Sequence, residues 1–257
     1  MLLLIDAGNT RIKWAIIDQD SPTSLGAWLH TGSVTHQEFA QNPTLWACYA
    51  IQRVIVSNVA GAAIKMQLAS ALQSRFFEVE WFTSQADLAG ITNRYQIPEQ
   101  LGCDRFASAI GAHVLFPAQA LVVATCGTAT TIDAVSAQGD FIGGMIAPGL
   151  QLMAQSLALN TAQLPHVQDA AAIEINFADH TQAAILSGCV AAQVGAIEHA
   201  VTRFSVMTGT IKAEATQTVP LCILSGGAAK FITPSLRVPY RQFDNLVLIG
   251  LQAYSSC

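Results

Sequence analysis

The chain has 257 residues, of which 52% are hydrophobic and only 11% are charged. Such an apolar chain buries enough surface to offset the entropy lost on ordering, which excludes an intrinsically disordered protein. Its 12 Lys and Arg against 17 Asp and Glu give a net charge of -5. This balance argues against nucleic acid as a partner, because nucleic-acid binding requires a basic patch.

No apolar run approaches the roughly 18 to 20 residues that cross a bilayer, and the opening run ends at Asp6. The start of the sequence also lacks the basic region and apolar stretch that mark a secretory signal. The six cysteines are scattered without a C-x-x-C pair, which favours free thiols over a zinc site. We therefore predict a soluble cytoplasmic protein without a membrane partner.

The first half is predicted to open with a β-hairpin, because apolar residues 1–5 and 12–17 flank a turn that contains Gly8 and Asn9. The other elements expected in this half are strands at 53–56 and 79–82 and helices at 60–76 and 103–114. Pro117 marks a break after them.

The second half begins with the same kind of pattern, since apolar strands expected at 120–124 and 131–135 surround a turn that contains Gly127. The remaining expected elements are strands at 141–146 and 221–224, a helix after 143–149, and helices at 181–204 and 246–254.

Each half also has a later buried strand that ends in a small polar turn, at 57–58 in the first half and at 225–226 in the second. A repeat of about 120 residues indicates an internal duplication. It predicts two domains, over residues 1–117 and 118–257.

The turn Asp6-Ala7-Gly8-Asn9-Thr10 has the residue types of a phosphate site. Glycine lets backbone N–H groups approach a phosphate closely, and the Asn and Thr side chains add donors. Asp6, at a strand end, is placed to hold a hydrated Mg²⁺ ion. The alternative is an ordinary hairpin turn, for which Asn and Gly are favoured.

A second turn, Gly127 to Thr131, combines a glycine with three hydroxyl side chains. Threonine is also a common strand residue, which offers a simpler explanation for Thr130 and Thr131. Two phosphate-suited hairpins, one in each half, nevertheless suggest a cleft that holds a polyphosphate from both sides.

The stretch Gly102-Cys103-Asp104-Arg105 begins a predicted helix. From the local sequence alone, an aspartate there is best explained as an N-cap or first-turn residue favoured by the helix macrodipole. In a catalytic interpretation, Asp104 accepts a hydroxyl proton as a general base and Arg105 holds an anionic substrate.

Two more glycine turns follow strands, at 143–149 and at 225–229, and permit close approach of a ligand or another backbone. Neither fits the P-loop or the dinucleotide-binding fingerprint. The histidines form no ligand-spaced pair and no G-x-S-x-G elbow is present, which argues against zinc enzymes and hydrolases.

Together these motifs resemble, in order and over nearly the whole chain, the type III pantothenate kinase family of the acetate and sugar kinase, Hsc70 and actin superfamily. The resemblance includes the Asp6 turn, residues 95–105 (Y-x-x-P-x-x-L-G-x-D-R), Gly127-Thr128-Ala129, residues 143–149, Thr181 and Ser225-Gly226-Gly227. The family also includes Bvg accessory factors, which were described as transcriptional regulators.

The resemblance implies an α/β fold of two tandem RNase H-like (actin-like ATPase) domains, with mixed sheets flanked by helices and ATP in the cleft. It implies a homodimer with Mg²⁺ and a monovalent cation, K⁺ or NH₄⁺. The residues implied to contact ATP are Asp6, Ala7, Gly8, Asn9, Thr10, Arg11, Ile12, Lys13, Thr128, Gly226 and Gly227, with Asp6 near Mg²⁺. Those implied to bind pantothenate are Tyr95, Gly102, Cys103, Asp104, Arg105 and Thr181, with Asp104 as the catalytic proton acceptor.

One position departs from the family pattern, which commonly has Asp two residues before the glycine of G-T-A as a monovalent-cation ligand. This chain has Thr125 there. A hydroxyl can coordinate K⁺ or NH₄⁺ but supplies no charge, so the cation requirement is in doubt while activity need not be lost.

The implied reaction is transfer of a phosphoryl group from ATP to pantothenate, giving 4'-phosphopantothenate for coenzyme A synthesis. A regulatory accessory protein that is catalytically weak or inactive is the main alternative, and Thr125 is its best support. A sugar or acetate kinase is a second alternative, against which the stretch from Tyr95 to Arg105 discriminates. Fold alone does not separate them.

Overall fold

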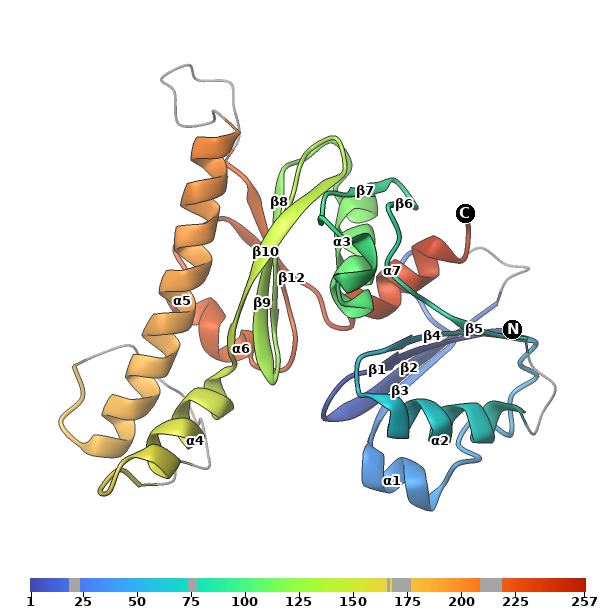
Figure 1. Ribbon diagram of the computed structural model, residues 1–257, viewed down its shortest axis with the longest axis horizontal. Helices are drawn as coiled ribbons and strands as arrows, with labels where there is room; N and C mark the ends of the chain where they lie inside the picture. Colours follow the sequence, from blue (N-terminus) through green and yellow to red (C-terminus); the bar gives the residue numbers. More distant parts are fainter. Residues whose placement is uncertain (19–23, 74–77, 166, 168–176, 209–218) are drawn as a thin grey trace. The chain divides into compact units, whose positions relative to one another are not determined.

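The computed structural model describes residues 1–18, 24–73, 78–165, 167, 177–208 and 219–257 (Figure 1). The chain forms two compact units. The first consists of Met1–Pro117, Gly139–Phe141 and Asn245–Cys257, and the second of Ala118–Gln138 and Ile142–Asp244. The expected division into 1–117 and 118–257 differs from these units chiefly in the last segment, which packs within the first unit.

The sheet of the first unit has five strands in the order β3-β2-β1-β4-β5. These strands are β1 (Leu2–Ala7), β2 (Arg11–Ile17), β3 (His30–Thr35), β4 (Arg53–Asn58) and β5 (Glu78–Trp81). β1 runs antiparallel to β2 and parallel to β4, so the sheet is mixed. The predicted hairpin is confirmed, because Leu2 pairs with Ile17 and Ala7 with Ile12.

Helices cover both faces of this sheet, which is why β1 is a continuous apolar run. Figure 1 shows α1 (His36–Gln41) and α2 (Ala62–Gln73) on one side, and α3 (Cys103–Leu115) and α7 (Leu246–Tyr254) on the other. Leu3 and Ile5 belong to the core under α1 and α2. Because side chains alternate along a strand, Asp6 lies on the opposite face, toward α3 and α7.

The last helix joins the first unit because α7 and α3 pack backbone against backbone. A Cβ atom on Gly250 of α7 would lie 1.8 Å from the carbonyl oxygen of Ala107, and one on Gly111 of α3 would lie 2.9 Å from the Gly250 nitrogen. At the other end of α7, the Tyr254 hydroxyl donates a hydrogen bond to Glu80. Two glycines therefore decide which unit receives the final helix.

Short elements complete the first unit: β6 (Asp87–Leu88), β7 (Ile91–Asn93) and the 3-10 turn Pro98–Gln100. β7 pairs in parallel with Asp140 and Phe141, the first residues of β10. This pairing places Phe141 beside the ring of Tyr95.

The second unit repeats the strand pattern of the first. Its strands follow the order β12-β11-β8-β9-β10. They are β8 (Leu121–Cys126), β9 (Ala129–Val135), β10 (Asp140–Pro148), β11 (Leu221–Ser225) and β12 (Tyr240–Gln242). As with β1, β2 and β4, β8 runs antiparallel to the next strand and parallel to β11. The repetition agrees with the suspected duplication.

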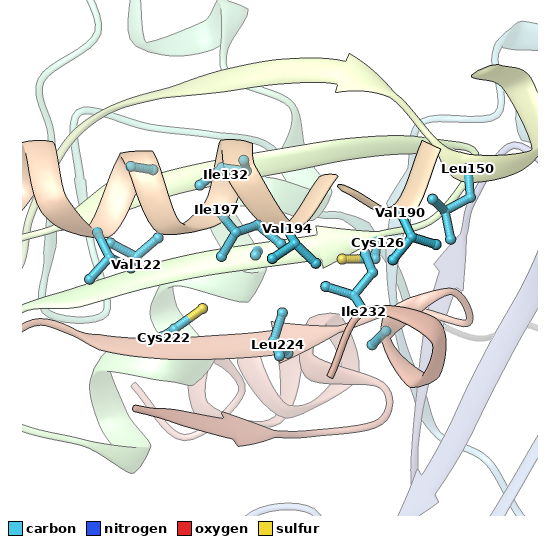
Figure 2. Packing of buried hydrophobic residues seen from close by; sticks show 14 of the residues in the cluster. Val122, Cys126, Ile132, Leu150, Val190, Val194, Ile197, Cys222, Leu224 and Ile232 are labelled. Carbon is cyan, nitrogen blue, oxygen red and sulfur yellow. The ribbon is translucent and has the colours of Figure 1, made fainter. Parts of the chain in front are cut away.

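The helices of the second unit are α4 (Leu150–Asn160), α5 (Thr181–Met207) and α6 (Ala229–Ile232), followed by the 3-10 turn Thr233–Ser235. Figure 2 shows the core that α5 makes with the sheet, in which Val190, Val194 and Ile197 lie against Val122, Cys126, Ile132 and Leu224.

Helix α5 is long and apolar enough, by length and composition alone, to cross a membrane. The expectation that no segment approaches that length was therefore wrong for this helix. Half of its most apolar window is buried inside the protein, which is the behaviour of a core helix and accounts for its composition.

Strands and helices with strong apolar patterns were predicted within a few residues of their observed ends. Of the helix predicted at 60–76, residues 74–76 lie outside the described part of the chain. Short or polar elements were missed: β3, α1, β6, β7, α6 and β12. β3 shows the reason, because its sequence HTGSVT is largely exposed and carries no apolar alternation.

The contact between α3 and α7 predicts a large loss of stability for Gly250→Ala. The added methyl group would meet the Ala107 carbonyl, and overpacking against backbone costs about 3 kcal/mol or more. Gly195→Ala in α5 is the control, because nothing lies within 4 Å of its Cβ position, and it should gain up to about 1 kcal/mol. Urea unfolding measures both, and equal stabilities would contradict the proposed packing constraint.

Candidate active site

The first candidate site is built around Asp6, at the end of β1. Asp6 is paired with Lys13 of β2 and with Ser57 of β4. Directly paired residues project from the same face of a sheet, so the carboxylate lies between an ammonium group and a hydroxyl group. The side chain of Asp6 is only partly exposed, whereas Ser57 is buried.

The start of α3 lies against this end of the sheet. The Cys103 Sγ atom is 3.3 Å from Ser57 Oγ and 3.6 Å from the Asn58 carbonyl oxygen. These contacts bring Asp104, the next residue, close enough to Asp6 for the two charges to interact. Neither Ser57 nor Asn58 was singled out from the sequence as a site residue, although both belong to the polar turn noted after this strand.

The residue before Cys103 and this acid is a glycine, Gly102. A Cβ atom on Gly102 would lie 2.8 Å from Asp104 Oδ1, the oxygen that accepts a 2.8 Å hydrogen bond from the Arg105 backbone N–H. Gly102 therefore leaves the room that Asp104 needs to receive this backbone N–H at the start of α3.

Both carboxyl groups hold their protons more tightly than usual. Burial raises the pKa of Asp6 to about 7, a shift that Lys13 opposes and Asp104 increases. Burial also raises the pKa of Asp104, against the backbone N–H and the guanidinium of Arg105. Two neighbouring acids with raised pKa values are typical of a site that handles protons or metal ions.

Arg105 is a fixed positive charge beside Asp104, with only 7% of its surface exposed. Its Nη1 atom donates a 2.9 Å hydrogen bond to the Tyr95 hydroxyl. The guanidinium carbon lies 5.6 Å from the ring centre of Tyr95 and 5.8 Å from that of Phe141. The aromatic rings hold the cation by the attraction of their faces for positive charge. Phe141 was not expected as part of this group from the sequence.

The turn between β1 and β2 is a tight one, closed by a 3.1 Å hydrogen bond from the Gly8 N–H to the Arg11 carbonyl oxygen. Asn9 at its tip is exposed. Arg11 turns toward β3, where its Nε atom donates to Ser33 Oγ at 2.8 Å. The predicted residues Asp6, Ala7, Gly8, Asn9, Thr10, Arg11, Ile12 and Lys13 thus form one hairpin, with Ala7 and Ile12 buried in it.

The second candidate site belongs to the second unit and consists of three glycine-containing turns. Gly226 has φ +92°, and its Cβ position is 2.3 Å from the Cys126 carbonyl oxygen. A Cβ atom on Gly149 would lie 2.1 Å from the carbonyl oxygen of Gly127, and its N–H donates to the Thr128 carbonyl at 2.9 Å. Gly149 and Gly226 therefore lie so close to the backbone around the turn at 127–128 that a side chain at either position would collide with a carbonyl oxygen.

Hydroxyl groups gather on one face of this sheet. Thr125 is paired with Thr131 of β9 and with Ser225 of β11. The Oγ1 atom of Thr131 is buried and has no hydrogen-bond partner among the described residues. The residues paired directly with Thr125 therefore present hydroxyl groups, and the buried Asp133 follows Thr131 by two positions on the same face of β9.

On the opposite face of this sheet, the buried side-chain amide of Gln193 joins three elements. The Gln193 side chain of α5 accepts from Thr130 Oγ1 at 2.5 Å and donates to the Pro148 carbonyl oxygen at 2.6 Å. A polar residue within the apolar pattern of α5 was the sequence signal for this role. Thr181, the exposed first residue of α5, lies about 18 Å along the helix from Gln193.

A hairpin with a parallel third strand in each unit, each with a glycine-containing turn, is an arrangement of the actin-like ATPase fold. Solved structures agree on the fold. A Campylobacter jejuni protein described as a conserved Baf family transcriptional activator aligns with a TM-score of 0.59 at 17% identity, over 99% of this chain and 97% of that one. Acetate kinase from Porphyromonas gingivalis aligns with a TM-score of 0.51 at 9% identity, over 99% and 98%.

Comparison with relatives in sequence shows the family to which this chain belongs. The profile of the type III pantothenate kinases matches residues 2–203. Type III pantothenate kinases from Janthinobacterium sp. (strain Marseille) and Herminiimonas arsenicoxydans are each 54% identical, over 98% of this chain and 96% of the relative. The chain belongs to the type III pantothenate kinase family.

The raised pKa of Asp6 predicts a pH-dependent gain in stability for Asp6→Asn. The wild-type carboxyl favours folding below its unfolded pKa near 3.8, and this contribution is lost as pH rises toward its folded value of about 7. The free energy of unfolding of the Asn variant should therefore rise relative to that of the wild type between pH 5 and pH 8. The expected rise is on the order of 1–2 kcal/mol, given the partial exposure of the Asp6 side chain. Urea unfolding at both pH values, with EDTA and without nucleotide, measures the gap. An advantage that is constant with pH would contradict the shift.

Proposed function

We propose that the protein transfers the γ-phosphoryl group of ATP to the primary hydroxyl of pantothenate, forming 4'-phosphopantothenate in the first step of coenzyme A biosynthesis. The observation that carries this proposal is the grouping of Asp104 with Asp6 on one side and with Arg105 on the other. Relatives named for this activity, at 54% identity over nearly their full length, support it. The grouping of these three charged residues favours catalysis over the regulatory alternative.

The residues proposed to hold ATP fit a polyphosphate by their chemistry. Carboxylate oxygens are preferred Mg²⁺ ligands, and Asp6 would take this role, while Lys13 beside it would contact phosphate. Backbone N–H groups of glycine turns suit phosphate oxygens. The proposed set is Asp6, Ala7, Gly8, Asn9, Thr10, Arg11, Ile12, Lys13, Thr128, Gly226 and Gly227. Bound Mg²⁺ would neutralise charge on the phosphates.

Pantothenate carries a carboxylate at one end and the primary hydroxyl group that is phosphorylated at the other, so its site requires both a cation and a base. The guanidinium of Arg105, held by Tyr95, would bind the carboxylate. The proposed contacts are Tyr95, Gly102, Cys103, Asp104, Arg105 and Thr181. Because Thr181 belongs to the second unit, its role is the least direct of these.

In the proposed step, Asp104 accepts the proton of the pantothenate hydroxyl as its oxygen forms a bond to the γ-phosphorus of ATP. The bond between that phosphorus and the bridging oxygen breaks, and ADP leaves with the electron pair. A carboxylate with a raised pKa is a stronger base at neutral pH, and positioning supplies most of the remaining rate enhancement.

We further propose a cytoplasmic homodimer. Exposed apolar side chains on β10 and α4 support an interface in the second unit: Ile142, Met145, Ile146, Leu152, Leu157 and Leu159. Exposed apolar groups of this kind are usually covered by another protein surface. We also propose that the break after Pro117 ends the main segment of the first domain, which residues 245–257 complete.

The role of Asp104 predicts that Asp104→Asn retains binding of Mg·ATP and pantothenate but loses turnover by about 10²- to 10⁴-fold, the usual contribution of a general base. Calorimetry gives the binding constants and pantothenate-dependent ADP release gives the turnover. Asp87→Asn, at an exposed acid of the same unit, is the matched control and should keep normal turnover. A kcat for Asp104→Asn close to that of the control would refute the assignment.

The hydroxyl at Thr125 predicts a weak preference for K⁺ or NH₄⁺ over Na⁺, because the hydroxyl groups of Thr125, Thr131 and Ser225 supply oxygen ligands without charge. Thr125→Asp adds that charge and should increase the ratio of turnover in K⁺ to turnover in Na⁺. ADP release in matched K⁺, NH₄⁺ and Na⁺ buffers tests both proteins. The same ratio in both would show that this position does not bind the cation.

A further inference from the structure

His36 is the first residue of α1, and the start of this helix is held firmly. Thr35 caps it: the Thr35 side chain accepts from the Glu38 N–H at 3.1 Å, and the Thr35 N–H donates to the Glu38 carboxylate at 2.6 Å. This reciprocal capping box fixes the backbone from which the His36 side chain projects.

The imidazole of His36 contacts the backbone of the β1–β2 turn. Its Nε2 atom lies 2.9 Å from the Gly8 carbonyl oxygen. A carbonyl oxygen only accepts, so Nε2 must carry a hydrogen and donate it. The bond joins positions 28 residues apart, in two different elements of the first unit.

The hydrogen bond from His36 holds the peptide group between Gly8 and Asn9, which the hydrogen bond within the turn does not hold. The Gly8 N–H is already bonded to the Arg11 carbonyl, but the next peptide, between Gly8 and Asn9, follows a residue with no Cβ. Glycine rotates with little steric resistance, so this peptide is the easiest in the turn to reorient. Because a trans peptide is planar, holding the Gly8 carbonyl toward α1 points the Asn9 N–H in the opposite direction.

The other side of the turn is attached to the same part of the sheet. Arg11 donates to Ser33 through Nε at 2.8 Å and to the Ser33 carbonyl oxygen through Nη2 at 3.3 Å. β3 and the start of α1 therefore hold both the Gly8 side and the Arg11 side of the turn.

We propose that His36 is a positioning residue for nucleotide binding, which acts by keeping the Gly8–Asn9 peptide oriented so that the Asn9 N–H is available to a phosphate oxygen. The inference rests on the proposed function only in taking this turn as the phosphate site. His36 itself need not touch the nucleotide.

The test compares His36→Ala, His36→Gln and His36→Asn. The amide nitrogen of Gln matches the reach of Nε2, whereas that of Asn is too short to reach the Gly8 carbonyl. The dissociation constant of the Mg²⁺ complex of AMP-PNP, measured by calorimetry, should rise about two- to tenfold in the Ala and Asn variants, the usual worth of one hydrogen bond. The Gln variant should bind as the wild type does.

The KM for pantothenate and the melting temperature should stay near wild-type values in all three variants. Gln37→Ala, at the exposed neighbour in α1, is the matched control and should change nothing. Binding that is unchanged in His36→Ala, or equally weakened in the Gln and Asn variants, overturns the inference. Because AMP-PNP binding does not require turnover, wild-type protein that binds AMP-PNP but does not phosphorylate pantothenate would instead contradict the proposed function.

Discussion

The backbone contact between α3 and α7 is the constraint on which the first site depends. Without side chains at Gly111 and Gly250, the two helices approach closely enough for backbone atoms to meet. α3 is thereby held on the sheet face that carries Asp6, and its first residue, Cys103, contacts the end of β4. The distance between the two acids thus follows from helix packing, and neither acid is close to the other in sequence.

That proximity sets the chemistry of the site. Burial and mutual repulsion shift the pKa of Asp6 upward to about 7, while Lys13 limits the shift. A divalent cation bound at Asp6 would favour the ionised form of this carboxyl group, so binding of the cation would release a proton there. Asp104 keeps a raised pKa although Arg105 is adjacent, because burial outweighs the attraction to the guanidinium.

The two units share one strand pattern but differ in the charge of the side chains that it brings together. Each has a hairpin with a third strand parallel to its first strand. In the first unit the residues paired across these strands include a carboxylate and an ammonium group, Asp6 and Lys13. In the second unit the equivalent face carries the hydroxyl groups of Thr125, Thr131 and Ser225. The directly paired positions are therefore charged in the first unit and uncharged in the second, and the turn of the first unit is also supported by β3 and α1.

Local periodicity and turn chemistry are enough to predict the hairpins, the long buried strands and helices, and the residue types at the glycine turns. The sequence also singles out Asp6, Asp104 and Arg105 as candidate site residues, because their chemistry is visible in their motifs. Three features are seen only in the folded chain: α7 packs on α3, Ser57 and Phe141 contact the residues of the first site, and His36 bonds to Gly8. These contacts join residues far apart in the chain, and no local pattern encodes which distant surfaces will meet.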